Sequence, residues 1–155
     1  MKILVTGGLG FIGSHTVVEL QNEGFDVIAI DNLSNSSLEV LDGIEKITGR
    51  KPVFENIDLR DKSAVQNFFK KHTDIDGVIH FAASKAVGES VENPLLYYEN
   101  NINSLVYLLQ ELSNLPQANF ILVHRVRFTV KPKKCRLLKM LRFNRRIHLM
   151  EILNK

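Results

Sequence analysis

The chain has 155 residues, of which 45% are hydrophobic and 24% are charged, and this composition excludes collagen-like, low-complexity and wholly disordered proteins. The single cysteine, Cys135, excludes a disulfide framework and a cysteine-rich zinc site. No apolar run approaches the roughly 18 residues of a membrane span. The first apolar residues, Ile3–Val5, are followed at once by Thr6, so we expect no signal peptide, no membrane partner and a cytoplasmic location.

The formal net charge of +3 is distributed unevenly along the chain. Residues 1–121 carry nine Lys and Arg against 16 Asp and Glu, whereas residues 122–155 carry eleven against one. We therefore divide the chain into residues 1–121 and a basic tail at 122–155. A tail of this charge could bind nucleic acid, but a shifted reading frame also accounts for it and no specific nucleic-acid partner is expected.

Short apolar, β-branched runs alternate with segments of helical periodicity over the first 123 residues. The predicted strands are Lys2–Thr6, Phe25–Ile30, Pro52–Glu55, Gly77–Phe81 and Asn119–Val123. The predicted helices are Phe11–Asn22, Leu38–Ile47, a helix capped by Asp61 and ending near Lys71, and a long helix from Pro94 to about Ser113. This alternation predicts an α/β fold with a doubly wound parallel sheet. From Arg125 onward the alternation stops, and we expect an irregular or helical tail.

Three glycines, Gly7, Gly10 and Gly13, lie between the first predicted strand and the first predicted helix. In a βαβ unit such glycines permit a tight turn, let the backbone approach a pyrophosphate and let the helix pack closely on the strand. The amino end of the helix then offers N–H groups and a partial positive charge to phosphate. Because the array stands between a strand and a helix, it predicts dinucleotide binding rather than a simple turn.

Two acidic residues follow predicted strands on the same side of the sheet. Asp31 comes 18 residues after Gly13 at the end of the second strand, where an acid accepts the ribose 2′-hydroxyl of NAD and repels the 2′-phosphate of NADP. NAD is therefore the expected cofactor. Asp58 follows the third strand, where it is expected either to border the adenine or to cap its own loop.

Four stretches resemble the N-terminal half of the UDP-glucose 4-epimerases, which are extended short-chain dehydrogenases/reductases with a Rossmann-like NAD-binding domain. They are Val5–His15, Asp31–Ser36, His80–Ser90 and Tyr97–Asn101. The glycine array is shared with many extended relatives, such as nucleotide-sugar dehydratases, whereas Lys85–Ser90 followed by Pro94 is closer to the epimerases. The resemblance covers residues 1–121 and then stops.

The resemblance implies a set of cofactor-binding residues that runs from the pyrophosphate through the adenosine to the nicotinamide side. The implied residues are Gly7, Gly10, Phe11, Ile12, Gly13, Asp31, Asn32, Asn35, Ser36, Asp58, Leu59, Phe81, Ala82, Ala83, Lys85 and Asn100. It also implies a UDP-sugar substrate, interconversion of UDP-glucose and UDP-galactose in galactose metabolism, and a homodimer for the intact enzyme. His80 is interpreted as a strand-end histidine whose hydrogen bonds are made within the protein, rather than as a catalytic residue.

No catalytic residue is assigned, because the family's Tyr-x-x-x-Lys pair does not occur in this sequence. The three tyrosines are Tyr97, Tyr98 and Tyr107, and none is followed by lysine four residues later. The tyrosine of that pair takes the sugar hydroxyl proton, with a pKa lowered by the lysine and the oxidised nicotinamide. We therefore expect an NAD-binding fragment that is inactive as this chain; the alternatives are another extended relative and a non-catalytic NAD-binding module.

Back-translation offers an origin for the tail. If one T is added to the T-rich codons of Ile121 and Leu122, residues 121–130 can be read as I-F-S-S-S-C-T-V-Y-G, which contains the family's serine motif after the fifth strand. In the same frame residues 146–155 can yield A-N-P-P-Y-G-N-T-K, which contains the missing Tyr-x-x-x-Lys pair. Both motifs occur in order in one frame, so we interpret residues 122–155 as read out of frame.

Overall fold

The computed structural model describes residues 1–84 and 87–123. Its five strands are β1 (Lys2–Thr6), β2 (Asp26–Asp31), β3 (Val53–Asn56), β4 (Gly77–His80) and β5 (Asn119–Leu122). They form one sheet in the order β3-β2-β1-β4-β5, and every neighbouring pair is parallel. The predicted doubly wound parallel sheet is confirmed. The tail from residue 124 lies outside the described residues, so its predicted irregular or helical character stays a prediction.

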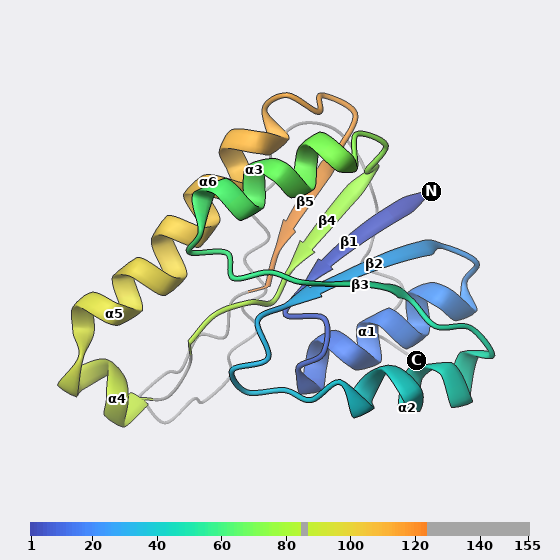
Figure 1. Ribbon diagram of the computed structural model, residues 1–155, viewed down its shortest axis with the longest axis horizontal. Helices are drawn as coiled ribbons and strands as arrows, with labels where there is room; N and C mark the ends of the chain where they lie inside the picture. The colour runs from blue at the N-terminus through green and yellow to red at the C-terminus, as the bar shows by residue number, and fades with distance from the viewer. Residues whose placement is uncertain (85–86, 124–155) are drawn as a thin grey trace, which may run out of the picture.

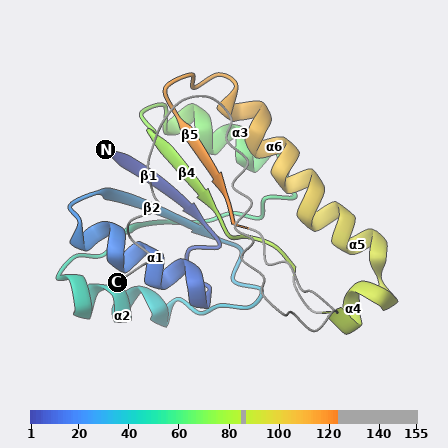
Figure 2. The same ribbon diagram turned by 180° about the vertical axis from the view of Figure 1, so that it is seen from behind.

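Helices cover both faces of this sheet. Helices α1 (Phe11–Asn22) and α2 (Glu39–Thr48) lie on one face, and α3 (Lys62–Lys71) and α6 (Ser104–Leu112) lie on the other, as Figures 1 and 2 show from opposite sides. Right-handed crossovers between parallel strands place the helices in this way. Among the described residues, no helix is long and apolar enough to cross a membrane.

Alternate residues of each strand enter two separate cores. Ile3 and Val5 of β1 pack with α1 and α2, whereas Leu4, between them, packs with α3 and α6. This division follows from the two-residue period of side chains along a strand. It also explains why β1, β2 and β4 read as continuous apolar runs, since a parallel sheet is buried on both faces.

Most element boundaries agree with the sequence prediction to within one residue. β2 begins at Asp26 rather than Phe25, and β4 ends at His80 rather than Phe81. Asp61 caps α3 as expected, because its Oδ1 accepts hydrogen bonds from the amides of Ser63 and Ala64.

The predicted long helix from Pro94 is not a regular α-helix. It consists of α5 (Pro94–Tyr98), a π-helical turn η1 (Glu99–Asn103) and α6, and it is preceded by a short helix, α4 (Val87–Glu92), that the sequence analysis did not predict. Ser104, the first residue of α6, donates a hydrogen bond from Oγ to the carbonyl of Asn100 in this turn. Single π-turns inside α-helices are frequent at functional sites, and the turn here carries Asn100, one of the predicted site residues.

Core packing on the α1–α2 face predicts that two isoleucines of α2 contribute very differently to the free energy of unfolding. Ile44 is 2% exposed and Ile47 is 67% exposed. We expect Ile44→Ala to lower the free energy of unfolding by about 2–5 kcal/mol, because it leaves a cavity beneath the sheet. Ile47→Ala, the matched control, should change it by less than about 0.5 kcal/mol. Urea denaturation measures both, and equal losses would contradict the assigned face.

Candidate cofactor-binding site

Most of the predicted site residues that the structure describes lie in the loops after β1, β2, β3 and β4, and Asn100 lies in η1. The chain leaves β1 toward β2 on one side, and β4 lies on the other side of β1. In open α/β sheets a ligand binds outside the carboxyl ends of the strands at such a switch point. The loops after these four strands therefore form the candidate site, and their hydrogen bonds determine its shape.

The glycine loop joins β1 to α1 in a compact turn. Gly7 has φ +65°, which favours glycine, and its carbonyl accepts a hydrogen bond of 3.1 Å from the amide of Gly10. A β-carbon on residue 13 would lie only 2.1 Å from the Gly7 carbonyl oxygen. Gly13 is therefore required for α1 to pack against the end of β1, as the sequence analysis predicted for this array.

The amino end of α1 faces the candidate site without a competing anion. Gly10 is the N-cap residue and makes no side-chain cap, and the first turn contains no acidic residue. Phe11 is 82% exposed and Ile12 is 50% exposed, so both predicted residues lie at the surface of this turn. Uncapped N–H groups and the helix dipole together suit a phosphate.

Asp31 has a structural role that the sequence analysis missed. Its side chain is buried, and Oδ2 accepts a 3.1 Å hydrogen bond from the amide of Leu9 in the glycine loop. Its Oδ1 accepts hydrogen bonds from the amide of Leu33 at 3.0 Å and the hydroxyl of Ser36 at 2.8 Å. The carboxylate expected to meet the ribose thus also joins the glycine loop to the loop after β2.

The loop after β2 folds back on itself around Leu33. Leu33 has φ +59°, the only positive φ among the described non-glycine residues. The bond to Asp31 and a 3.1 Å bond from the Ser34 amide to Asn32 Oδ1 stabilise this turn. Asn35, another predicted site residue, is exposed at its tip. Left-handed backbone at a branched residue costs energy and is concentrated at functional sites.

Asp58 caps its own loop and forms an ion pair with Arg60. Its Oδ1 accepts from the Arg60 amide at 2.9 Å, and its Oδ2 accepts from Arg60 Nη2 at 2.6 Å. These hydrogen bonds lower the pKa of Asp58 to about 2, against a smaller opposing effect of burial. Asn32 donates to Asp58 at 3.4 Å, so the loops after β2 and β3 meet. The expectation that Asp58 caps its own loop is confirmed. Leu59, the next residue, is buried. The contact of these two residues with the adenine stays a prediction.

The loop after β4 lies directly against the glycine loop. The amide of Phe81 donates to the Thr6 carbonyl at 3.0 Å, and a β-carbon on Gly7 would lie 2.9 Å from the nitrogen of Ala82. Phe81 is buried, and Ala83 is exposed. Lys85, the remaining predicted residue of this segment, lies outside the described residues.

The π-turn holds the other end of this loop. Asn101 accepts a hydrogen bond from the Ser84 amide at 2.8 Å and donates to the Ser84 carbonyl at 3.1 Å. Asn100 Nδ2 donates to Ser84 Oγ at 2.8 Å, so this predicted cofactor residue contacts the loop itself. Ser84 and Asn101 were not among the residues predicted from the sequence, because their pairing joins two segments 17 residues apart.

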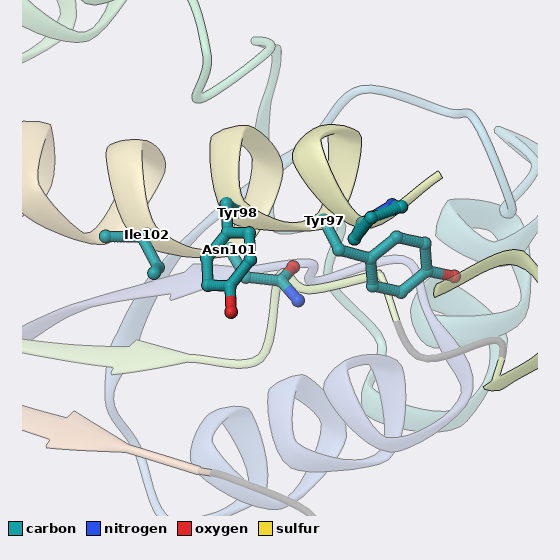
Figure 3. Close-up of a pocket in the computed structure, with 5 residues that line it drawn as sticks. Tyr97, Tyr98, Asn101 and Ile102 are labelled. Atoms are coloured by element: carbon teal, nitrogen blue, oxygen red, sulfur yellow. The ribbon is translucent and has the colours of Figure 1, made fainter. Parts of the chain in front are cut away.

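A separate hollow lies on the surface of α5 and η1, as Figure 3 shows. Pro94, Tyr97, Tyr98, Asn101 and Ile102 line it. None of these residues belongs to the glycine loop or to the loop after β2. Asn101 also pairs with Ser84 of the loop after β4, so it links the hollow to that loop.

The space around each glycine predicts different effects on stability for substitutions in the glycine loop and in α2. Gly13→Ala should lower the free energy of unfolding by about 1–3 kcal/mol, because its methyl group would overlap the Gly7 carbonyl. Gly43→Ala, inside α2 with no atom within 4 Å of the added carbon, should be neutral or stabilise by about 0.5–1 kcal/mol. Thermal and urea unfolding measure the difference, and an unaffected Gly13→Ala protein would disprove the close packing.

Comparison with known proteins agrees with this geometry. The NAD dependent epimerase/dehydratase family matches residues 3–124. The chain is 52% identical over 112 residues to the UDP-glucose 4-epimerase of Yersinia enterocolitica, covering 72% of this chain and 33% of that protein. The corresponding protein of Bacillus subtilis is 51% identical with the same coverage. The chain thus spans about a third of the length of these relatives.

The fold also matches solved structures. The UDP-glucose 4-epimerase of Bifidobacterium longum, solved in complex with NAD+ and UDP, has a TM-score of 0.74 and 44% identity over 79% of this chain and 36% of that one. The Stenotrophomonas maltophila UDP-glucose 4-epimerase, solved with bound NAD and a formylated UDP-arabinopyranose, has a TM-score of 0.71, covers 77% of this chain and 36% of that one, and is 43% identical. The family model covers residues 3–124, which is most of the chain, and the chain therefore belongs to the NAD dependent epimerase/dehydratase family.

Proposed function

We propose that residues 1–121 form the NAD-binding part of a UDP-glucose 4-epimerase. The observation that carries this proposal is the meeting of the glycine loop, the uncapped amino end of α1 and the buried Asp31 carboxylate at one switch point. The similarity to UDP-glucose 4-epimerases supports the epimerase assignment over a nucleotide-sugar dehydratase.

The residues present fit a dinucleotide. The amide-rich turn at Gly7–Gly13 would hold the pyrophosphate, because side chains are absent where its backbone must come close. Asp31, Asn32, Asn35 and Ser36 would surround the adenosine ribose, and Asp58 with Leu59 would border the adenine. The predicted residues toward the nicotinamide are Phe81, Ala82, Ala83, Lys85 and Asn100.

The proposed activity of the intact protein is the interconversion of UDP-glucose and UDP-galactose. Bound NAD would supply reversible hydride transfer at C4 of the sugar, and this chain's own residues would bind and orient the dinucleotide. The UDP-sugar substrate, a homodimer of the intact enzyme and a cytoplasmic location are parts of the same proposal. Solved relatives that contain UDP or a UDP-sugar derivative support the substrate class.

For residues 122–155 we propose an out-of-frame origin. The family match ends at residue 124, close to the change in charge at residue 122. The one-base shift that restores the serine motif also restores the Tyr-x-x-x-Lys pair. A non-catalytic NAD-binding protein is the second candidate function, favoured by the absence of that pair from the sequence as printed.

Cofactor choice tests the role of Asp31. We expect the chain to bind NAD at least about tenfold more tightly than NADP, because a 2′-phosphate would meet the buried carboxylate. Asp31→Ala should reduce this preference and weaken NAD binding. Asp26→Ala, on the same strand but exposed at its other end, is the matched control and should leave both unchanged. Calorimetry measures the affinities, and an unchanged preference in Asp31→Ala would contradict the assignment.

Epimerase activity tests the reading of the tail. The 155-residue chain should not convert UDP-galactose to UDP-glucose, since loss of general acid–base catalysis alone costs about 10²–10⁴-fold. A gene with one T restored near codon 122, expressed with its downstream sequence, should regain activity. Comparable activity from the unrepaired chain would show that the proposed catalytic pair is wrong. An intact repaired protein without activity would favour the non-catalytic NAD-binding protein.

A further inference from the structure

Two buried polar side chains meet at the centre of the sheet, beneath the candidate site. Thr6 and His80 are register partners at the ends of β1 and β4, and they are 0% and 3% exposed. Thr6 Oγ1 lies 2.6 Å from His80 Nδ1. The proposed cofactor site does not use either side chain directly, although the glycine loop and the loop after β4 begin at the next residues.

Hydrogen-bond accounting at the Thr6 hydroxyl assigns the protons. The amide of Ala82, which can only donate, approaches Oγ1 at 3.4 Å, so the oxygen is the acceptor in that contact. The hydroxyl proton is buried and needs an acceptor of its own, because an unpaired buried donor costs about 1–3 kcal/mol. Among the described residues, the acceptor within reach of Thr6 Oγ1 is His80 Nδ1.

We propose that His80 is a neutral positioning residue that carries its ring proton on Nε2 and, through the Thr6 hydroxyl, holds the loop after β4 against the glycine loop. The chain of hydrogen bonds runs from the Ala82 amide to Thr6 Oγ1 and from the Thr6 hydroxyl to His80 Nδ1. A proton on Nδ1 would point at the hydroxyl and leave the Thr6 proton without this acceptor.

The ring of His80 is buried beside Phe120. The His80 ring lies 6.1 Å from the Phe120 ring, and the side chain is almost fully buried next to the apolar core. A proton on Nδ1 would remove the lone pair that accepts the Thr6 hydroxyl, so this hydrogen bond requires the proton on Nε2. His80 therefore acts here as a fixed acceptor.

Thr6 joins the two loops by two groups at once. Its carbonyl accepts from the Phe81 amide at 3.0 Å, and its hydroxyl oxygen accepts from the next amide, Ala82. Gly7, the residue after Thr6, has no side chain and lies close to the Ala82 backbone. A rotation of the Thr6 side chain would thus shift the segment proposed to follow the cofactor toward the nicotinamide; this consequence rests on the proposed function.

The protonation state is tested directly in the full 155-residue chain. Long-range ¹H–¹⁵N NMR of the labelled protein at about pH 7, where histidines can occur in either charge state, reports which ring nitrogen is protonated. The His80→Asn spectrum identifies the His80 signals. We expect a neutral ring with the proton on Nε2. An imidazolium, or a neutral ring protonated on Nδ1, would overturn the proposal whether or not the protein binds NAD.

Variants of Thr6 test the positioning role. Thr6→Val keeps the shape but removes the hydroxyl, so amide exchange at Ala82 should accelerate and the NAD dissociation constant should rise about tenfold. Thr6→Ser keeps the hydroxyl and should restore both to within about threefold of the parent. Thr73→Val, at an exposed position, is the matched control and should change neither.

The outcomes separate this inference from the proposed function. Absence of NAD binding by the parent chain would reject the proposed function, while the ring protonation and the Ala82 exchange rate would still test the Thr6–His80 pair. Equal Ala82 exchange in Thr6→Val and the parent would overturn the positioning role. Should Thr6→Val fail to fold, the NMR of the parent chain decides the assignment.

Discussion

The close approach of α1 to the end of β1 is the constraint on which the site depends. The Gly7 carbonyl lies where a β-carbon on residue 13 would be, so the helix can begin there only because residue 13 is glycine. This contact aims the amino end of α1 at the switch point of the sheet. It also brings the amides of Gly8 and Leu9 to the end of β2, where they donate to the Ile30 carbonyl and the Asp31 carboxylate.

Asp31 joins two loops of the candidate site through its carboxylate. Its three hydrogen bonds to the protein join the glycine loop to the loop after β2, and they hold the carboxylate where the proposed ribose contact requires it. A buried carboxylate is costly unless it accepts hydrogen bonds, so the protein donors make its placement possible. Substitution at this position should therefore change the shape of the candidate site.

The loop after β4 is held from both sides. Thr6 accepts hydrogen bonds from the amides of Phe81 and Ala82 at its beginning, and Asn101 pairs with both backbone groups of Ser84 at its end. The π-turn within the long helix carries Asn100 and Asn101 side by side toward Ser84. Positions held by several hydrogen bonds in this way are pre-organised, which reduces the entropy lost when a ligand binds.

Local patterns in the sequence determined most of the fold, the glycine loop and the position of Asp31 in the candidate site. The apolar runs, the glycine spacing, the Asp61 cap and the acid after the second strand each act over a few residues, and they predicted the strands, α1 and the place of Asp31. Contacts between residues far apart in the chain could not be predicted from these local patterns. Thr6 and His80 are 74 positions apart, and Ser84 and Asn101 are 17 apart. The π-turn and these hydrogen bonds were decided only by the tertiary structure, because strand register and helix packing bring such groups together and composition does not.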